Sequence, residues 1–192
     1  MPITMEGTTT ASNPGKLKIS TLKLKRYFKL NSIDWFFIYI CSLLPKKQLA
    51  YLYKKNKLAQ IFVNYKEAFL YGCLNPAKVV NRQKSLVAVY TDLSAYETGP
   101  YYVIKIYKER LFVLNQFVNT GDKVSTVAIY EGEPTQYPAH WTDFHPTVLE
   151  CFCSNRKECK RAFDSIPNEE WLLLEEGLKT IPQLEEGLYF FE

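Results

Sequence analysis

Apolar and polar residues alternate along several short segments in the second half of the chain, a pattern typical of β-strands. These segments are rich in β-branched and aromatic residues and cover residues 86–93, 101–109, 110–117 and 124–131. Turn-forming residues at 97–100 and 119–122 separate several of them, and 78–80 and 148–152 are shorter candidates. Five or six short strands at this spacing predict a small antiparallel β-barrel or bent sheet, similar to oligonucleotide-binding (OB) or SH3-like folds.

Helical periodicity precedes and follows these strands. Apolar residues recur at spacings of three and four over 46–72, which predicts one amphipathic helix that ends near Gly72. Start signals and apolar runs predict two closing helices at 154–163 and 168–179, followed by a last strand or packed tail at 187–191. The predicted fold class is therefore α+β, with N-terminal helices and two C-terminal helices.

The segment before the first helix is harder to interpret. Lysines alternate with leucine and isoleucine over 16–30, which favours a strand, although Tyr27 and Phe28 break the alternation and leave a helix open. Asp34 could then cap a short helix through the apolar run 35–44. Ten apolar residues are too few to cross a bilayer core of about 30 Å as a helix.

Composition divides the chain into three parts. Residues 1–15 are rich in small and turn-forming residues and predict a flexible lead-in, residues 16–67 form a basic aromatic arm, and residues 68–192 form the strand-rich domain. Residues 1–70 hold twelve basic and three acidic residues, a net charge of +9, whereas residues 71–192 hold twelve and seventeen, a net charge of −5. This asymmetry indicates an acidic partner for the arm, which is a membrane surface, a nucleic acid, another protein or the chain's own domain.

Cysteine usage suggests a reducing compartment. The chain has five cysteines, an odd number, and its N-terminal residues lack a basic start followed by an apolar run. We therefore expect a cytoplasmic protein with free thiols, with membrane association through the arm as an additional possibility.

Several phrases of the second half occur in a familiar order. They include Asn-Pro-Ala-Lys-Val-Val at 75–80, Val-Ala-Val-Tyr-Thr-Asp-Leu at 87–93, Gly-Asp-Lys-Val at 121–124 and His-Trp-Thr-Asp-Phe-His-Pro at 140–146. Over roughly residues 68–192 the chain resembles a bacterial domain family of unknown function. The resemblance implies a domain boundary and a bacterial origin, and it brings no established activity or catalytic residues with it.

One region of the domain gathers residues that could carry chemistry, namely His140, His145, Cys151, Cys153 and Cys159. Thiolate and imidazole groups suit zinc, but no paired C-x-x-C motif occurs, so we expect neither a metal site nor a cofactor. On a strand, the side chains of Cys151 and Cys153 would share one face. The enzymatic alternative is a hydrolase that uses a thiol beside a histidine in this region. The alternative without chemistry is that the cysteines are small core residues.

The function favoured by the sequence is a non-catalytic protein-binding or adaptor module in the bacterial cytoplasm. Aromatic residues make up 15% of the chain, and large rings are the usual anchors of protein interfaces. The expected partner-binding residues are Trp35, Phe36, Phe37 and Tyr39, and the expected electrostatic residues are Lys16, Lys18, Lys23, Lys25, Arg26 and Lys29. The alternative is a peripheral membrane or nucleic-acid-binding protein that acts through the arm, and no small-molecule ligand is identified from the sequence.

Overall fold

The computed structural model describes residues 12–95, 99–114, 118–132 and 140–191. Four helices come first, namely α1 (Thr21–Phe28), α2 (Ser32–Leu43), α3 (Lys46–Lys55) and α4 (Lys57–Tyr71). The strands follow as β1 (Cys73–Asn81), β2 (Leu86–Asp92), β3 (Tyr102–Lys108), β4 (Lys123–Glu131) and β5 (Asp143–Val148). The helices α5 (Arg156–Asp164) and α6 (Asn168–Thr180) and the strand β6 (Gly187–Phe190) close the chain, and two short 3-10 helices are η1 (Leu111–Val113) and η2 (Leu149–Cys151).

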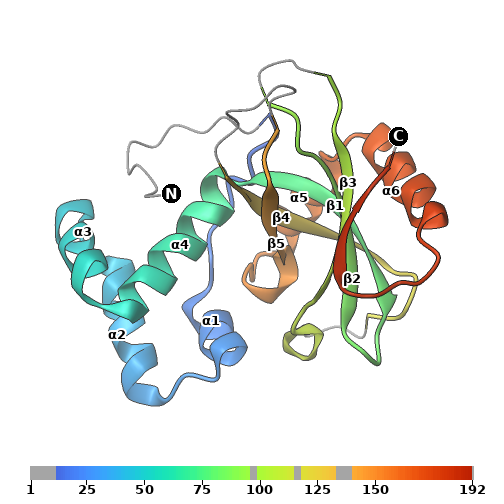
Figure 1. The fold of residues 1–192 in the computed structure, drawn as a ribbon. Coiled ribbons are helices and arrows are strands. Elements are labelled where there is room, and N and C mark those ends of the chain that lie inside the picture. The colour runs from blue at the N-terminus through green and yellow to red at the C-terminus, as the bar shows by residue number, and fades with distance from the viewer. Residues whose placement is uncertain (1–11, 96–98, 115–117, 133–139, 192) are drawn as a thin grey trace.

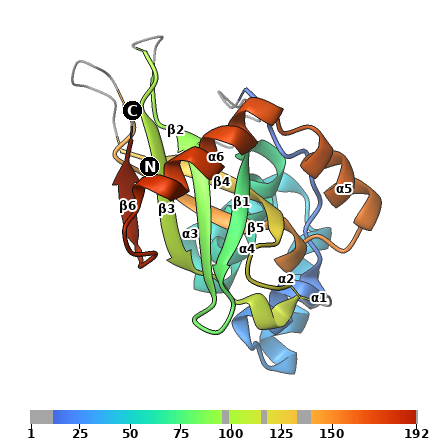
Figure 2. The same ribbon diagram turned by 90° about the vertical axis from the view of Figure 1, so that its right-hand side faces the viewer.

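The strands form one antiparallel sheet in the order β5-β4-β1-β2-β3-β6 (Figure 1). The sheet curls into a half-barrel. Lys105 on β3 reaches Asp143 and the carbonyl of Phe144 on β5 at 2.7–2.9 Å, although three strands lie between β3 and β5 in the sheet order. Helix α6 packs across β1, β2 and β3 on the outer face of the sheet, as Figure 2 shows. The expected α+β fold with a bent antiparallel sheet is confirmed.

The arm and the sheet share one core. Phe152, which follows η2 and is fully buried, is surrounded by Tyr27, Tyr65 and Phe69 from α1 and α4, with ring centroids 4.5–5.5 Å away. The domain boundary expected between residues 67 and 68 therefore lies inside α4, which continues to Tyr71. Residues 1–11 of the expected flexible lead-in lie outside the described ranges, and Pro14 forms a β-bridge with Cys73.

Three expected elements differ in the structure. Residues 21–28 of the segment expected to favour a strand form α1, because Ser20 caps the helix and Lys29 ends it in the left-handed conformation (φ 53°). The single helix expected over 46–72 is two helices, since Asn56 leaves helical geometry and its side chain accepts hydrogen bonds from the backbone of Leu58 and Ala59. The cap of α2 is Asn31 rather than Asp34.

Two expected strands become 3-10 helices. The strand expected over 110–117 is replaced at 111–113 by η1, and its residues 115–117 lie outside the described ranges. The strand expected over 148–152 is absent at 149–151. There β5 ends at Val148 and η2 follows, because the amide of Cys153 donates to the carbonyl of Leu149 and turns the chain. This turn is what separates Cys151 from Cys153.

Candidate functional site

Helix α2 presents an apolar face to solvent. Ile33, Phe36, Ile40 and Leu43 follow one another at spacings of three and four, so they lie on one face of the helix, and Tyr39 borders them. All five are exposed, from 40% for Ile40 to 81% for Ile33. We call these five residues the α2 face. Figure 1 places α2 and α3 beyond α4, on the side away from the sheet.

The expected partner-binding residues divide between this face and the core. Phe36 and Tyr39 lie on the α2 face, whereas Trp35 and Phe37 are half-buried. The ring of Trp35 lies 6.0 Å from that of Tyr39, with the ammonium group of Lys25 5.0 Å from its centre. Ile33, Ile40 and Leu43 join this face through successive spacings of three and four that include Phe36, a signal that aromatic content alone does not show.

Basic residues lie at both ends of α2. Lys25, Arg26 and Lys29 are in or just after the last turn of α1, and Lys46 and Lys47 open α3. The arm contains two acidic residues, of which Asp34 is hydrogen-bonded to the cap Asn31, and burial raises the pKa of Glu67. The arm is therefore positively charged around the α2 face. Of the other expected electrostatic residues, Lys16 and Lys18 are exposed.

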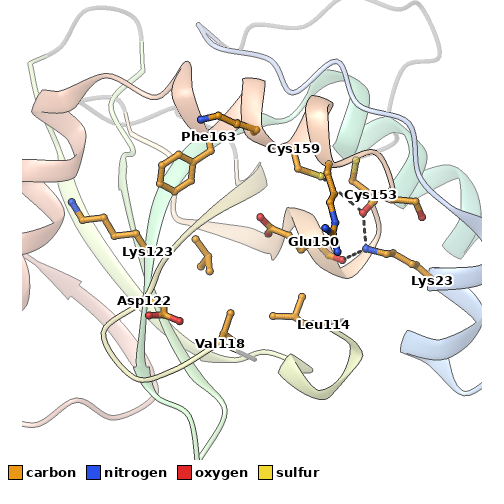
Figure 3. Close-up of a pocket in the computed structure, with 13 residues that line it drawn as sticks. Lys23, Leu114, Val118, Asp122, Lys123, Glu150, Cys153, Cys159 and Phe163 are labelled. Carbon is orange, nitrogen blue, oxygen red and sulfur yellow. Dashed lines mark hydrogen bonds between the residues drawn. The ribbon is translucent and has the colours of Figure 1, made fainter. Parts of the chain in front are cut away.

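Lys23 points away from the solvent-facing basic residues. Its ammonium group donates hydrogen bonds of 2.6 Å to the carbonyls of Glu150 and Cys153 (Figure 3). Lys23 therefore joins α1 to η2 and lies in the wall of a cavity.

This cavity has a volume of about 530 Å³ and is bounded by α1, η1, the start of β4 and α5 (Figure 3). Part of its wall is apolar, formed by Leu114, Val118, Val124 and Phe163. The rest is polar and includes the basic residues Lys123, Arg156 and Lys160 and the thiols of Cys153 and Cys159. The cavity thus combines apolar surface, positive charge and two sulfur atoms.

The carboxyl group of Glu150 also lies at this cavity. Burial raises its pKa, and its Oε2 atom is buried with no hydrogen-bond partner among the described residues. An unpaired carboxylate is costly to bury, so the protonated form is favoured. As a protonated acid, Glu150 could donate a hydrogen bond into the cavity.

The five residues considered for metal binding or hydrolysis lie in separate environments. His140 stacks on Tyr101 with ring centroids 4.0 Å apart, and His145 is exposed and contacts Glu131 on the neighbouring strand. Cys151 is buried in the core, and burial raises the pKa of its thiol. Cys153 and Cys159 lie side by side at the cavity, which neither histidine lines.

The described residues contain no group of three or more histidine, cysteine or acidic side chains placed to hold a metal ion. The expectation that Cys151 and Cys153 share one strand face is wrong, since η2 turns the chain between them. Among the described helices, none is long and apolar enough to span a bilayer.

The half-barrel sheet, the helix α6 on its outer face and the N-terminal helical arm together make an α+β domain. This domain matches a known protein family. The chain belongs to the family described as "Protein of unknown function (DUF3239)", whose model matches residues 60–182. This confirms the resemblance to an uncharacterised domain family, and the matched range begins within α4. The helices α1, α2 and α3, including the α2 face, lie outside it.

One solved structure shares the fold. It is described as "Crystal structure of a putative membrane protein from Corynebacterium diphtheriae" and superposes with a TM-score of 0.51 at 16% sequence identity, covering 62% of this chain and 99% of that one. At this identity the similarity concerns the fold alone. A comparison with curated proteins finds no match.

Proposed function

We propose that this protein is a non-catalytic module that attaches peripherally to an anionic membrane surface through the α2 face. The observation that supports this most directly is a fully apolar exposed helix face with lysines at both of its ends. A helix of this kind lies in the interfacial plane of a bilayer, with apolar side chains among the acyl chains and lysines at the headgroups.

The kind of basic residue in the arm favours lipid over protein. Eleven of its twelve basic residues are lysine and one is arginine. Protein interfaces are enriched in arginine and depleted in lysine, whereas lysine side chains readily extend to lipid headgroups. The description of the similar Corynebacterium diphtheriae protein as a "putative membrane protein" agrees with this proposal, although the proposal does not depend on it.

The second candidate partner is another protein, which the sequence analysis favoured. The spacing of Ile33, Phe36 and Ile40 is that of helices that insert into a hydrophobic groove of another protein. Such a groove would need an acidic rim to match the arm. The experiment below separates the two candidates.

The test measures binding of the full chain to vesicles of phosphatidylcholine, with and without an equal part of phosphatidylglycerol, by co-sedimentation. We expect binding to the anionic vesicles alone, weakening as salt rises to physiological strength, because each lysine near an anionic surface contributes about 1 kcal/mol. Phe36→Ser combined with Ile40→Ser should weaken binding at least about 100-fold, since burying each side chain contributes about 1.5–3 kcal/mol.

Leu172→Ser is the matched control, because Leu172 is an exposed apolar residue on α6, remote in sequence from the arm. It should bind anionic vesicles as the wild type does. If the wild-type chain fails to bind anionic vesicles even at low salt, the membrane proposal is wrong and the protein-docking candidate takes its place.

A further inference from the structure

We infer that Cys153 and Cys159 form a redox-active dithiol site in the cavity, which closes to a disulfide when a small peroxide enters. This inference is independent of the α2 face and of membrane attachment. It concerns a covalent modification of two residues that the sequence considered as metal ligands, hydrolase thiols or core residues.

The side chains of Cys153 and Cys159 are close neighbours. Cys153 lies two residues before the cap Asn155 of α5, and Cys159 is the fourth residue of that helix. The Sγ atom of Cys159 lies 3.9 Å from the carbonyl oxygen of Cys153, and Figure 3 shows the two side chains next to each other at the cavity. Both are free thiols in the structure.

The environment makes the two thiols chemically unequal. The interaction with the neighbouring Cys159 side chain is the main cause that lowers the pKa of Cys153 to about 7, and the same interaction raises the pKa of Cys159. Lys23 also favours a thiolate at Cys153, since its ammonium group lies against the Cys153 carbonyl. Cys153 is therefore the nucleophile and Cys159 the resolving thiol.

The charged and titratable groups around Cys153 come from several elements. They are Lys23 of α1, Lys123 of β4, Glu150 of η2, and Arg156, Glu158, Cys159 and Lys160 of α5. Four of these are cations, whereas burial favours the protonated form of Glu150. Asp122, before β4, also lines the cavity, and the charge of Glu158 opposes a thiolate at Cys153. The thiolate is therefore favoured mainly by the neighbouring Cys159 and by the backbone at Asn155, with Lys23 as a smaller contribution.

The reaction balances with hydrogen peroxide as the oxidant. The Cys153 thiolate attacks one peroxide oxygen and breaks the O–O bond, which gives a sulfenic acid at Cys153 and hydroxide, and the hydroxide takes up a proton to become water. The thiol of Cys159 then attacks the sulfenic sulfur, the S–S bond forms and a second water leaves. Two thiols are oxidised to one disulfide, and one peroxide is reduced to two waters.

The remaining three cysteines lack this arrangement. All five cysteines except Cys73 are buried, but only Cys153 and Cys159 line the cavity. Burial raises the pKa values of Cys41, Cys73 and Cys151. A thiol with a raised pKa is mostly protonated at neutral pH and reacts slowly with peroxide. Oxidation should therefore be selective for the Cys153–Cys159 pair.

The experiment treats the full chain with equimolar hydrogen peroxide, blocks the remaining thiols with N-ethylmaleimide and maps the products by mass spectrometry. We expect the loss of two hydrogens per chain, restored by dithiothreitol, and a tryptic cross-link between the peptide 158–160, which holds Cys159, and the peptide 124–156. That second peptide contains both Cys151 and Cys153, so Cys151→Ser serves to show that the cross-link survives without Cys151.

Variants of each thiol test the assigned roles. In Cys159→Ser the disulfide cannot form, and a sulfenic acid at Cys153 should be trapped by dimedone. In Cys153→Ser, Cys159 should stay reduced. Cys73→Ser is the matched control and should lose two hydrogens as the wild type does.

The pH profile gives a readout that a structural role would not change. The oxidation rate should level off above about pH 8, because the pKa of Cys153 is about 7. An ordinary thiol with a pKa of about 8.5 would still gain close to tenfold per pH unit between pH 6 and 8. The inference is overturned if Cys41, Cys73 or Cys151 is oxidised before the pair, or if the rate keeps rising through pH 9.

Discussion

Phe152→Ala is expected to lower the free energy of unfolding by about 3–5 kcal/mol, the usual cost of removing a fully buried phenylalanine side chain. The ring of Phe152 is fully buried and packs against Tyr27 at 4.5 Å and Tyr65 at 4.6 Å, which come from α1 and α4. Few neighbours can move into the space that the ring leaves, because α1 also contacts η1 and η2 and α4 also contacts β4. Urea unfolding followed by fluorescence would measure the change.

Phe112→Ala is the matched control, because Phe112 is a phenylalanine that is 66% exposed on η1. It should change the free energy of unfolding by no more than about 0.5 kcal/mol. The Phe152 variant should still unfold in a single transition, because the arm and the sheet share one core and should unfold together. A loss below about 1 kcal/mol, or two separate transitions, would show that the arm is an appendage with a core of its own.

The sequence predicted the strands well where the local pattern matches the tertiary environment. Segment 86–93 is rich in β-branched residues and becomes β2, which is buried along almost its whole length. Segments 101–109 and 124–131 become β3 and β4 within one residue at each end. Turn residues before and after these segments marked their ends, but the sequence pattern does not show that β4 pairs with β1 instead of β3.

The wrongly predicted helix and strand boundaries come from side chains that hydrogen-bond to the backbone a few residues away. Asn56 could have been identified as a cap, because the apolar spacing skips from Tyr53 to Leu58 around it. Residues 110–117 have a strand composition, yet the carboxylate of Glu109 accepts from the amide of Arg110 and turns the chain out of the sheet. A local pattern cannot show this, because it depends on what else holds that carboxylate.

The candidate sites were predictable only in part. The apolar run of α2 is evident in the sequence, but which side faces solvent depends on how α2 packs against α1 and α4. Lys23 reads as one more cation of the arm, and the structure turns it inward onto two backbone carbonyls. The pairing of Cys153 with Cys159 needs the turn at η2 followed by α5, which the expected strand at 148–152 concealed.

Glu109 is the buried polar residue that the sequence gave least reason to notice. Its side chain is 2% exposed and accepts hydrogen bonds from the hydroxyl groups of Tyr27 and Tyr107 and from the amides of Arg110 and Val148, at 2.6–3.2 Å. Burial is the main cause that raises the pKa values of both tyrosines, so their phenols stay protonated and donate. The carboxylate thereby ties α1 to β3 and to the end of β5.

Replacing this carboxylate should cost as much as emptying the aromatic core. We expect Glu109→Leu to lower the free energy of unfolding by about 3–5 kcal/mol, because a hydrogen bond to a charged acceptor contributes about 1.5–3 kcal/mol and the backbone amide of Val148 cannot be replaced by an apolar group. Glu109→Gln keeps one acceptor oxygen and should cost about half as much. Thermal and urea unfolding would rank the two variants.

A double-mutant cycle with Tyr27→Phe isolates the contact between the arm and the domain. Tyr27 donates to Glu109 at 2.7 Å, so removing both partners should cost less than the sum of the single variants, with a coupling of about 1 kcal/mol. Tyr51→Phe is the control, because the hydroxyl of Tyr51 contacts Lys55 on the surface of α3 and should show no coupling to Glu109. If Glu109→Leu costs less than about 1 kcal/mol, or if the Tyr27 cycle is additive, this carboxylate does not hold the arm in place, and the aromatic cluster around Phe152 carries that role alone.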